Sequence, residues 1–126
     1  MANAEPAFRC SVPIPPSANN LFINVGGAVR GRRARGPDYK RWLHDAGWLI
    51  KTQVQPAEGA ALVPGIVRVL IEAPLNRRRD LDNALKPLLD LMVKMHIIDN
   101  DCWIDDLRIV RIGTGDQVTI SIWPMI

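Results

Sequence analysis

Two stretches of the chain carry apolar residues at helical spacing. In the first, Pro37 suits the opening turn of a helix, and apolar residues recur every three or four positions from Tyr39 to Ile50. The second runs from about Asn83 to Met95 and carries an apolar stripe. The residues of that stripe are Leu85, Leu88, Leu89, Met92 and Met95. We therefore predict two main helices, each with one buried face.

A proline lies inside the second predicted helix. Proline lacks an N–H group and clashes with the preceding turn, at a cost of about 3 kcal/mol. With Pro87 at this position, the helix either begins late, near Ala84, or bends at the proline. Asp90 falls on the polar side of the same helix, and we interpret it as a residue of a solvated face or of a helix-surface pair.

Shorter apolar runs predict the strands. They cover residues 8–12, 21–25, 66–73, 104–112 and 118–123. In the third run Val67, Val69 and Ile71 fall on one side, as in a strand with one buried face. The Gly-Thr-Gly-Asp-Gln sequence at 113–117 separates the last two runs, and it is typical of a hairpin turn.

The order of these elements predicts the fold class. A chain of 126 residues is long enough for one hydrophobic core, and neither a repeat nor a long linker divides it. We expect an α+β fold, a single small domain over residues 1–126. Its mixed or antiparallel sheet would have the two main helices packed on one face.

Charge along the chain is unevenly distributed. The net charge of +3 is mild, although the pI of about 9.2 favours a polyanionic partner. Six basic residues and one acid lie between Arg30 and Arg41, whereas four acids and no base lie between Asp99 and Asp106. A basic arm for phosphate and an acidic cluster for metal are what a nuclease needs. The same runs are also compatible with charges on a solvated surface.

Composition excludes several other classes of protein. No run approaches the roughly 18 apolar residues of a membrane span, and the first ten residues lack the pattern of a signal peptide. Cys10 and Cys102 form no CxxC motif and adjoin no histidine cluster, which argues against a zinc site. We expect a cytoplasmic protein, bound to the nucleoid through DNA, with two buried, reduced cysteines. The sequence alone leaves a disulfide open.

The densest cluster of chemically active side chains reads Arg-Arg-Arg-Asp-Leu-Asp-Asn-Ala-Leu-Lys, over residues 77–86. In extended backbone, Asp80 and Asp82 project to the same side, and Lys86 lies about one helical turn beyond Asp82. Carboxylates hold the hard divalent cations that neutralise charge in phosphodiester hydrolysis. Aspartate and asparagine before an apolar helix are also good N-caps, and on local sequence alone capping is favoured. The local motif therefore does not decide between the two roles.

A resemblance over a longer stretch favours the metal site. The string RRRDLDNALKPLLDLMVKMHIIDNDCWIDDLRIVR resembles the signature region of the RusA family of Holliday-junction resolvases. That pattern is a basic run, then Asp-x-Asp-Asn with a lysine four residues after its second aspartate, then an apolar helix, an acidic pair and a strand. The segment Pro-Ile-Pro-Pro-Ser-Ala-Asn at 13–19 resembles the opening of the family. Similarity extends from about residue 11 to residue 123.

The resemblance implies roles for particular residues. It makes Asp80, Asp82 and Asp101 the acidic residues that bind metal, and Lys86 the functional lysine. The acidic pair of the family reads Asp99-Asn100-Asp101 here, so Asp99 is an alternative to Asp101 as the third carboxylate.

The resemblance also implies an activity and its partners. The implied enzyme is a crossover junction endodeoxyribonuclease of DNA recombination and repair. It would use Mg²⁺, with Mn²⁺ as a substitute, and act as a homodimer that places paired nicks across a four-way junction.

Basic side chains supply the candidate DNA contacts. Arg77, Arg78 and Arg79 adjoin the aspartates, where we expect them to hold a strand near the scissile phosphate. The glycine-rich loop over 26–35 would follow the phosphate backbone. Its arginines are Arg30, Arg32, Arg33 and Arg35. Asn19 in the proline-rich segment completes the candidate set.

Three other functions remain open on the sequence. The first alternative is a DNA-structure-binding module that has lost catalysis, although Asp80, Asp82, Asp101 and Lys86 are all present. An unrelated Mg²⁺-dependent phosphohydrolase acting on nucleotides is the second alternative, and no Walker-type loop supports it. The third is a structural protein in which the aspartates only cap a helix.

Overall fold

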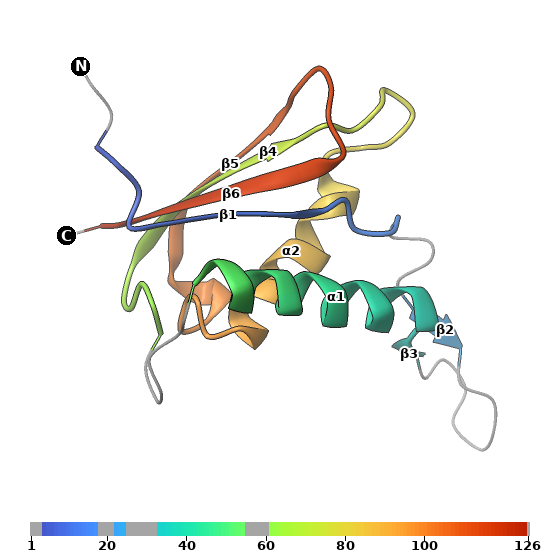
Figure 1. Cartoon of the computed structure of the whole chain (residues 1–126), viewed down its shortest axis with the longest axis horizontal. Helices are drawn as coiled ribbons and strands as arrows, with labels where there is room; N and C mark the ends of the chain where they lie inside the picture. Colours follow the sequence, from blue (N-terminus) through green and yellow to red (C-terminus); the bar gives the residue numbers. More distant parts are fainter. Residues whose placement is uncertain (1–3, 18–21, 25–32, 55–60, 126) are drawn as a thin grey trace.

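Two helices pack on one face of a four-stranded sheet in the computed structural model, which describes residues 4–17, 22–24, 33–54 and 61–125. Helices α1 (Pro37–Gln53) and α2 (Asp82–Lys94) lie on the same side of the sheet (Figure 1). This arrangement confirms the predicted α+β fold.

The sheet is mixed, and its strand order differs from the chain order. It contains β1 (Phe8–Pro13), β4 (Val67–Ala73), β5 (Ile104–Arg111) and β6 (Gln117–Pro124). The spatial order is β1-β6-β4-β5, in which β4 and β5 are parallel and the other neighbours are antiparallel. Parallel neighbours need a long crossover connection. Helix α2 and the short 3-10 helix η2 (Asp101–Trp103) provide it.

The predicted hairpin over residues 113–117 is wrong, because β4 lies between β5 and β6. The connection instead passes over the end of β4. Gly115 has φ +140°, and a Cβ added to it would lie 3.7 Å from the Pro74 side chain. The Ile112 N–H donates to the Ala73 carbonyl oxygen at 3.0 Å. Glycine and aspartate in a turn indicate that the chain reverses, but not which strand becomes the neighbour.

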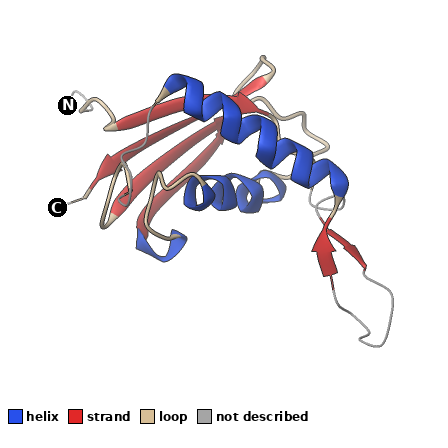
Figure 2. Cartoon of the chain, turned by 60° about the horizontal axis from the view of Figure 1, so that its bottom comes forward, coloured by secondary structure: helices blue, strands red, loops and turns tan. Residues whose placement is uncertain are grey.

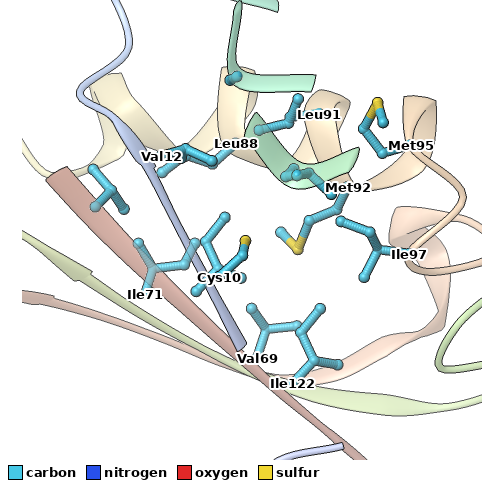
Figure 3. Close-up of a cluster of buried hydrophobic side chains, with 14 of the residues drawn as sticks. Cys10, Val12, Val69, Ile71, Leu88, Leu91, Met92, Met95, Ile97 and Ile122 are labelled. Carbon is cyan, nitrogen blue, oxygen red and sulfur yellow. The ribbon is translucent and has the colours of Figure 1, made fainter. Parts of the chain in front are cut away.

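The core fills the space between the sheet and the helices. In β4, Val67, Val69 and Ile71 are fully buried and face this core, as their alternation predicted. Figure 3 shows residues of β1, β4 and β6 meeting the apolar side chains of α2. Burying one such aliphatic side chain contributes about 1.5–3 kcal/mol to stability. The sheet therefore fixes the position of α2 through a continuous apolar contact.

The buried stripe of α2 differs from the predicted one. Leu88 and Met92 are buried as expected, but Leu91 is also fully buried. Leu85 and Leu89 are only partly buried and pack at the margin of the core. The helix is therefore rotated so that part of its apolar surface faces away from the sheet.

Both helices begin close to the predicted positions. Pro37 occupies the first turn of α1, which confirms that prediction. Helix α2 begins at Asp82 and contains Pro87, so the proline does not delay its start. Its opening turn is tight, because the Asn83 N–H donates to the Asp80 carbonyl oxygen at 3.2 Å, three residues back.

A second, two-stranded sheet lies beyond the N-terminus of α1. Strands β2 (Phe22–Asn24) and β3 (Arg33–Arg35) pair antiparallel, with Phe22 opposite Arg35 (Figure 2). The end of the predicted basic loop is therefore a strand. Asn19, Arg30 and Arg32, three of the candidate DNA contacts, lie outside the described residues.

The two cysteines lie in different environments. Cys10 is buried in β1, and Cys102 is exposed on η2. Both are free thiols, in agreement with the expectation of reduced cysteines, but the expectation that both are buried is wrong for Cys102. Burial raises the pKa of Cys10 to about 12.

Candidate functional site

Asp80 and Asp82 are exposed at the point where the loop after β4 enters α2. The N-cap residue of α2 is Leu81, and no side chain makes a capping hydrogen bond there. The capping interpretation of these aspartates is therefore wrong. Neither carboxylate forms a hydrogen bond or ion pair with another described residue, so their oxygens remain available to a ligand.

The loop before Asp80 is held by its own backbone and by β5. The Arg78 N–H donates to Asn76 Oδ1 at 2.9 Å, which closes a tight turn. The Arg111 guanidinium, at the end of β5, donates to the carbonyl oxygens of Leu75 at 3.1 Å and Arg79 at 3.2 Å. It also donates to the Asn76 carbonyl oxygen. One side chain thus fixes the loop that presents the aspartates.

Arg79 has a structural contact that the sequence did not indicate. Its Nη2 donates to the Pro16 carbonyl oxygen at 2.8 Å, while its Nε is buried without a partner among the described residues. Burial lowers the pKa of Arg79 from its usual value. Arg77 and Arg78 are exposed. They are therefore the two arginines of this run that face solvent beside the aspartates.

Lys86 lies one turn along α2 from Asp82, and it belongs to a network that links the two helices. Its Nζ is 3.6 Å from Asp90 Oδ2, and the same oxygen accepts a hydrogen bond from the hydroxyl of Tyr39 on α1. Tyr39 is fully buried, and the side chain of Asp90 is 24% exposed. The ion pair with Lys86 confirms the interpretation of Asp90 as a member of a helix-surface pair, whereas the partial burial of its side chain contradicts a fully solvated face.

Asp101 lies at the other end of α2. It is exposed on η2 and lines a shallow depression of about 300 Å³ together with Asp90, Val93, Lys94 and Asn100. These neighbours belong to the second half of α2 and to the loop that follows it.

The topology explains why the aspartates are separated. Asp80 follows the C-terminal end of β4, whereas Asp101 precedes the N-terminal end of β5, and the two strands are parallel. The 13 residues of α2 span roughly 20 Å between these ends. The structure therefore places Asp80, Asp82 and Lys86 around the start of α2 and Asp101 beyond its C-terminal end.

Asp99, the alternative third carboxylate, has a backbone contact. Its Oδ2 accepts a hydrogen bond from the Gly65 N–H at 3.0 Å. Asn100 accepts one from the Cys102 N–H at 3.2 Å and so caps η2. Of the two aspartates in this segment, Asp101 is the one that lines the depression. These contacts favour Asp101 over Asp99 as a metal ligand.

Comparison with known proteins establishes the family. The family model described as Endodeoxyribonuclease RusA matches residues 13–123. This chain belongs to the RusA family of endodeoxyribonucleases. The expectation of an endonuclease, drawn from the resemblance, is thereby confirmed.

Three RusA relatives match over most of their length. A protein of Aquifex aeolicus, named crossover junction endodeoxyribonuclease RusA, is 33% identical over 93% of this chain and 89% of its own. The protein of the same name from Enterobacteria phage HK97 is 30% identical over 82% of each chain. The one from Escherichia coli strain K12 is 27% identical over 94% of this chain and 95% of its own.

The donor set suits a hard cation only in part. Asp80 and Asp82 offer carboxylate oxygens, the ligands that Mg²⁺ prefers. Among the described residues of this RusA chain, however, no three His, Cys, Asp or Glu side chains form a group that could hold a metal ion. The third carboxylate expected at the site, Asp101, is at the far end of α2.

No described helix has the length and apolar character needed to cross a membrane.

Sequence reasoning missed the role of Arg111 and the contact between Asp90 and Tyr39. Arg111 lies near the end of the strand predicted over residues 104–112, and nothing local indicated that its guanidinium would bind carbonyl groups more than 30 residues away. Asp90 lies four residues after Lys86, which is the spacing of a helical ion pair. The helix-surface pair was therefore one of the two interpretations of Asp90 from the sequence, whereas its hydrogen bond to Tyr39 depends on the packing of α1 on α2.

Proposed function

We propose that this chain is a Mg²⁺-dependent endodeoxyribonuclease that resolves four-way DNA junctions by paired, symmetric phosphodiester cleavage. Its place would be in DNA recombination and repair in the cytoplasm. The observation that carries the proposal is that Asp80 and Asp82 are exposed at the start of α2, near Lys86, and make no capping hydrogen bond to the helix. The names of the RusA relatives support the choice of a crossover junction as substrate.

Each side chain has a proposed task in the hydrolysis. Asp80 and Asp82 hold Mg²⁺, which when bound supplies Lewis-acid stabilisation and an activated water. Lys86 neutralises charge that develops on a phosphoryl oxygen. Arg77 and Arg78 bind phosphates next to the cut. Water adds to phosphorus and the bond to the 3′ oxygen breaks, which leaves 5′-phosphate and 3′-hydroxyl ends.

The separation of Asp101 from the other aspartates favours a site shared between two copies. A two-fold dimer with antiparallel α2 helices would place Asp101 of one copy beside Asp80 and Asp82 of the other. An isologous dimer of this kind has two identical sites, which suits the paired strands of a four-way junction.

Helix α2 has an apolar surface that can serve this contact. Partly buried hydrophobic residues recur at every fourth position along it, at the margin of the core. They are Leu81, Leu85, Leu89 and Val93. Residues four apart lie on one face of a helix, so these form a single ridge from the Asp82 end to the Asp101 end.

Cleavage of a synthetic, end-labelled four-way junction tests the proposal. We expect wild type to make symmetric nicks with Mg²⁺ and to leave linear duplex uncut. Asp82→Asn should bind the junction without cutting it. Junction binding without cleavage under Mg²⁺ or Mn²⁺ would instead indicate a DNA-binding module. Binding of mononucleotides together with a failure to bind the junction would indicate a nucleotide phosphohydrolase.

A further inference from the structure

Trp48 is a large apolar residue on α1 that the core does not use. It is 63% exposed, whereas its neighbours Leu43, Ala46 and Ile50 on the inner face of the helix are buried. A depression adjoins each side of its indole ring. One of about 120 Å³ lies toward α2, and one of about 520 Å³ lies on the outer side of α1.

The depression toward α2 exists because position 47 lacks a side chain. A Cβ added to Gly47 would lie 2.9 Å from Met95 Sδ, closer than real side chains approach. Glycine is unfavourable in the interior of a helix, so its presence here is explained by the close approach of Met95. Gly47 and Met95 thus line the depression between the two helices, next to the Trp48 ring.

The charges beside Trp48 differ between its two sides. Lys51 and Lys94 line the depression toward α2, and no acidic side chain among the described residues does. The outer depression includes Asp45, whose carboxylate is 3.3 Å from His44 Nδ1. A polyanion that reaches Trp48 is therefore favoured on the α2 side and disfavoured on the outer side.

Lys94 connects this surface with the candidate site. It lines both the depression beside Trp48 and the depression that contains Asp101. A chain of phosphates that leaves Asp101 therefore meets Lys94 first, and then the exposed indole with Lys51 one turn away on α1.

We propose that Trp48 receives one unstacked base of the DNA strand that leads away from Asp101, with Lys51 and Lys94 contacting the flanking phosphates. Every base has an aromatic face, so stacking on an exposed indole needs no particular sequence, and lysines beside it bind the backbone. This inference rests on the proposed function, because it takes Asp101 as part of the cleavage site. It assigns to α1 a DNA contact that none of the aspartates or arginines provides.

Binding to a four-way junction in EDTA, measured by fluorescence anisotropy, tests the proposal separately from cleavage. Trp48→Ala should weaken binding about 5- to 100-fold, the range expected for loss of one base–aromatic stack. Trp48→Phe should restore most of the affinity. Lys51→Gln and Lys94→Gln should each reduce the salt dependence by roughly 0.7 in log–log slope. The matched control is Arg108→Gln, which removes an exposed charge on β5, opposite Leu70 of β4. It should change neither the affinity nor its salt dependence.

Junctions with one abasic nucleotide at successive positions around the exchange point identify the base. At one position, wild type should lose as much affinity as Trp48→Ala loses on the intact junction. Trp48→Ala should bind that abasic junction no more weakly than it binds the intact one. Equal binding by wild type and Trp48→Ala overturns the inference while leaving the proposed function intact. Dissociation of a Trp48→Ala dimer in sedimentation would assign the surface to a second copy and also overturn it. A wild type that does not bind the junction overturns both proposals.

Discussion

The hydroxyl of Tyr39 on α1 donates a hydrogen bond to the Asp90 carboxylate on α2. Tyr39 is fully buried, so its hydroxyl meets this acceptor in place of bulk water. The accepting oxygen also lies 3.6 Å from Lys86 Nζ. A buried contact between the helices therefore ends at the lysine that we place in the cleavage site.

Replacing Tyr39 with phenylalanine removes the hydrogen bond to Asp90 and changes the volume of the side chain little. Because a hydrogen bond to a charged group is worth about 1.5–3 kcal/mol, the free energy of unfolding should fall by roughly that amount. Urea denaturation measures the change. Asp90→Asn keeps an acceptor for Tyr39 and should lose less stability, although it removes the charge opposite Lys86. Wild-type stability in Tyr39→Phe would contradict the role given to the contact.

A site shared between two copies predicts rescue on mixing two inactive variants. Asp82→Asn and Asp101→Asn should each fail to cut a junction. A mixed dimer, however, would contain one intact site, made by Asp80 and Asp82 of one copy and Asp101 of the other. We expect refolded mixtures to nick one strand of the junction and the separate variants to nick none. A mixture as inactive as its components would place all three aspartates of each site in one chain.

The absence of a side-chain cap on α2 predicts that Asp80 can be changed without loss of stability. Removing a true N-cap costs about 1 kcal/mol, whereas an exposed surface substitution usually stays within about 0.5 kcal/mol. Asp80→Ala should therefore unfold at the wild-type urea midpoint while losing cleavage. A midpoint shift equivalent to 1 kcal/mol or more would restore the capping role.

The buried thiol of Cys10 predicts a dependence of stability on pH. Its pKa is raised from 9.0 to about 12 in the folded chain, so above pH 9 the unfolded chain releases a proton that the folded chain retains. This contribution therefore lowers stability as pH rises from 9 toward 12, by about 1.4 kcal/mol per pH unit.

Comparison with Cys10→Ala isolates that contribution from the other groups that titrate in the same range. The difference in unfolding free energy between the two proteins should change with pH above 9 and stay constant below it. In the native protein, a thiol reagent should modify Cys102, which is exposed, and spare Cys10. Equal reactivity of the two cysteines would show that the core around β1 opens readily.

How far the sequence predicted the structure depended on the range of each interaction. The periodicity of residues 37–50 and 83–95 predicted both helices, because burial of one helical face repeats locally. The turn at 113–117 was identified as a reversal, yet the insertion of β4 between its flanking strands depends on contacts distant in sequence. No local pattern carries that information.

The candidate site follows the same rule. The proximity of Asp80, Asp82 and Lys86 was predictable, because all three lie within two turns of one helix start. The position of Asp101 at the other end of α2 was not predictable, because it follows from the parallel pairing of β4 with β5. The capping role favoured by the local sequence failed because Leu81, without a polar side chain, occupies the N-cap position.

The clamp formed by Arg111 sets an order of assembly. Its guanidinium holds the loop at residues 75–79 only when β5 lies alongside β4, with Ala73 opposite Arg111. During synthesis, the helix that carries Asp82 is therefore complete before the loop beside it has its support. The acidic site would acquire its final shape late, once the chain has reached residue 111 and its parallel strand has docked. A nascent or truncated chain that stops earlier would expose these charges without a fixed geometry, which delays any nuclease activity until the sheet has formed.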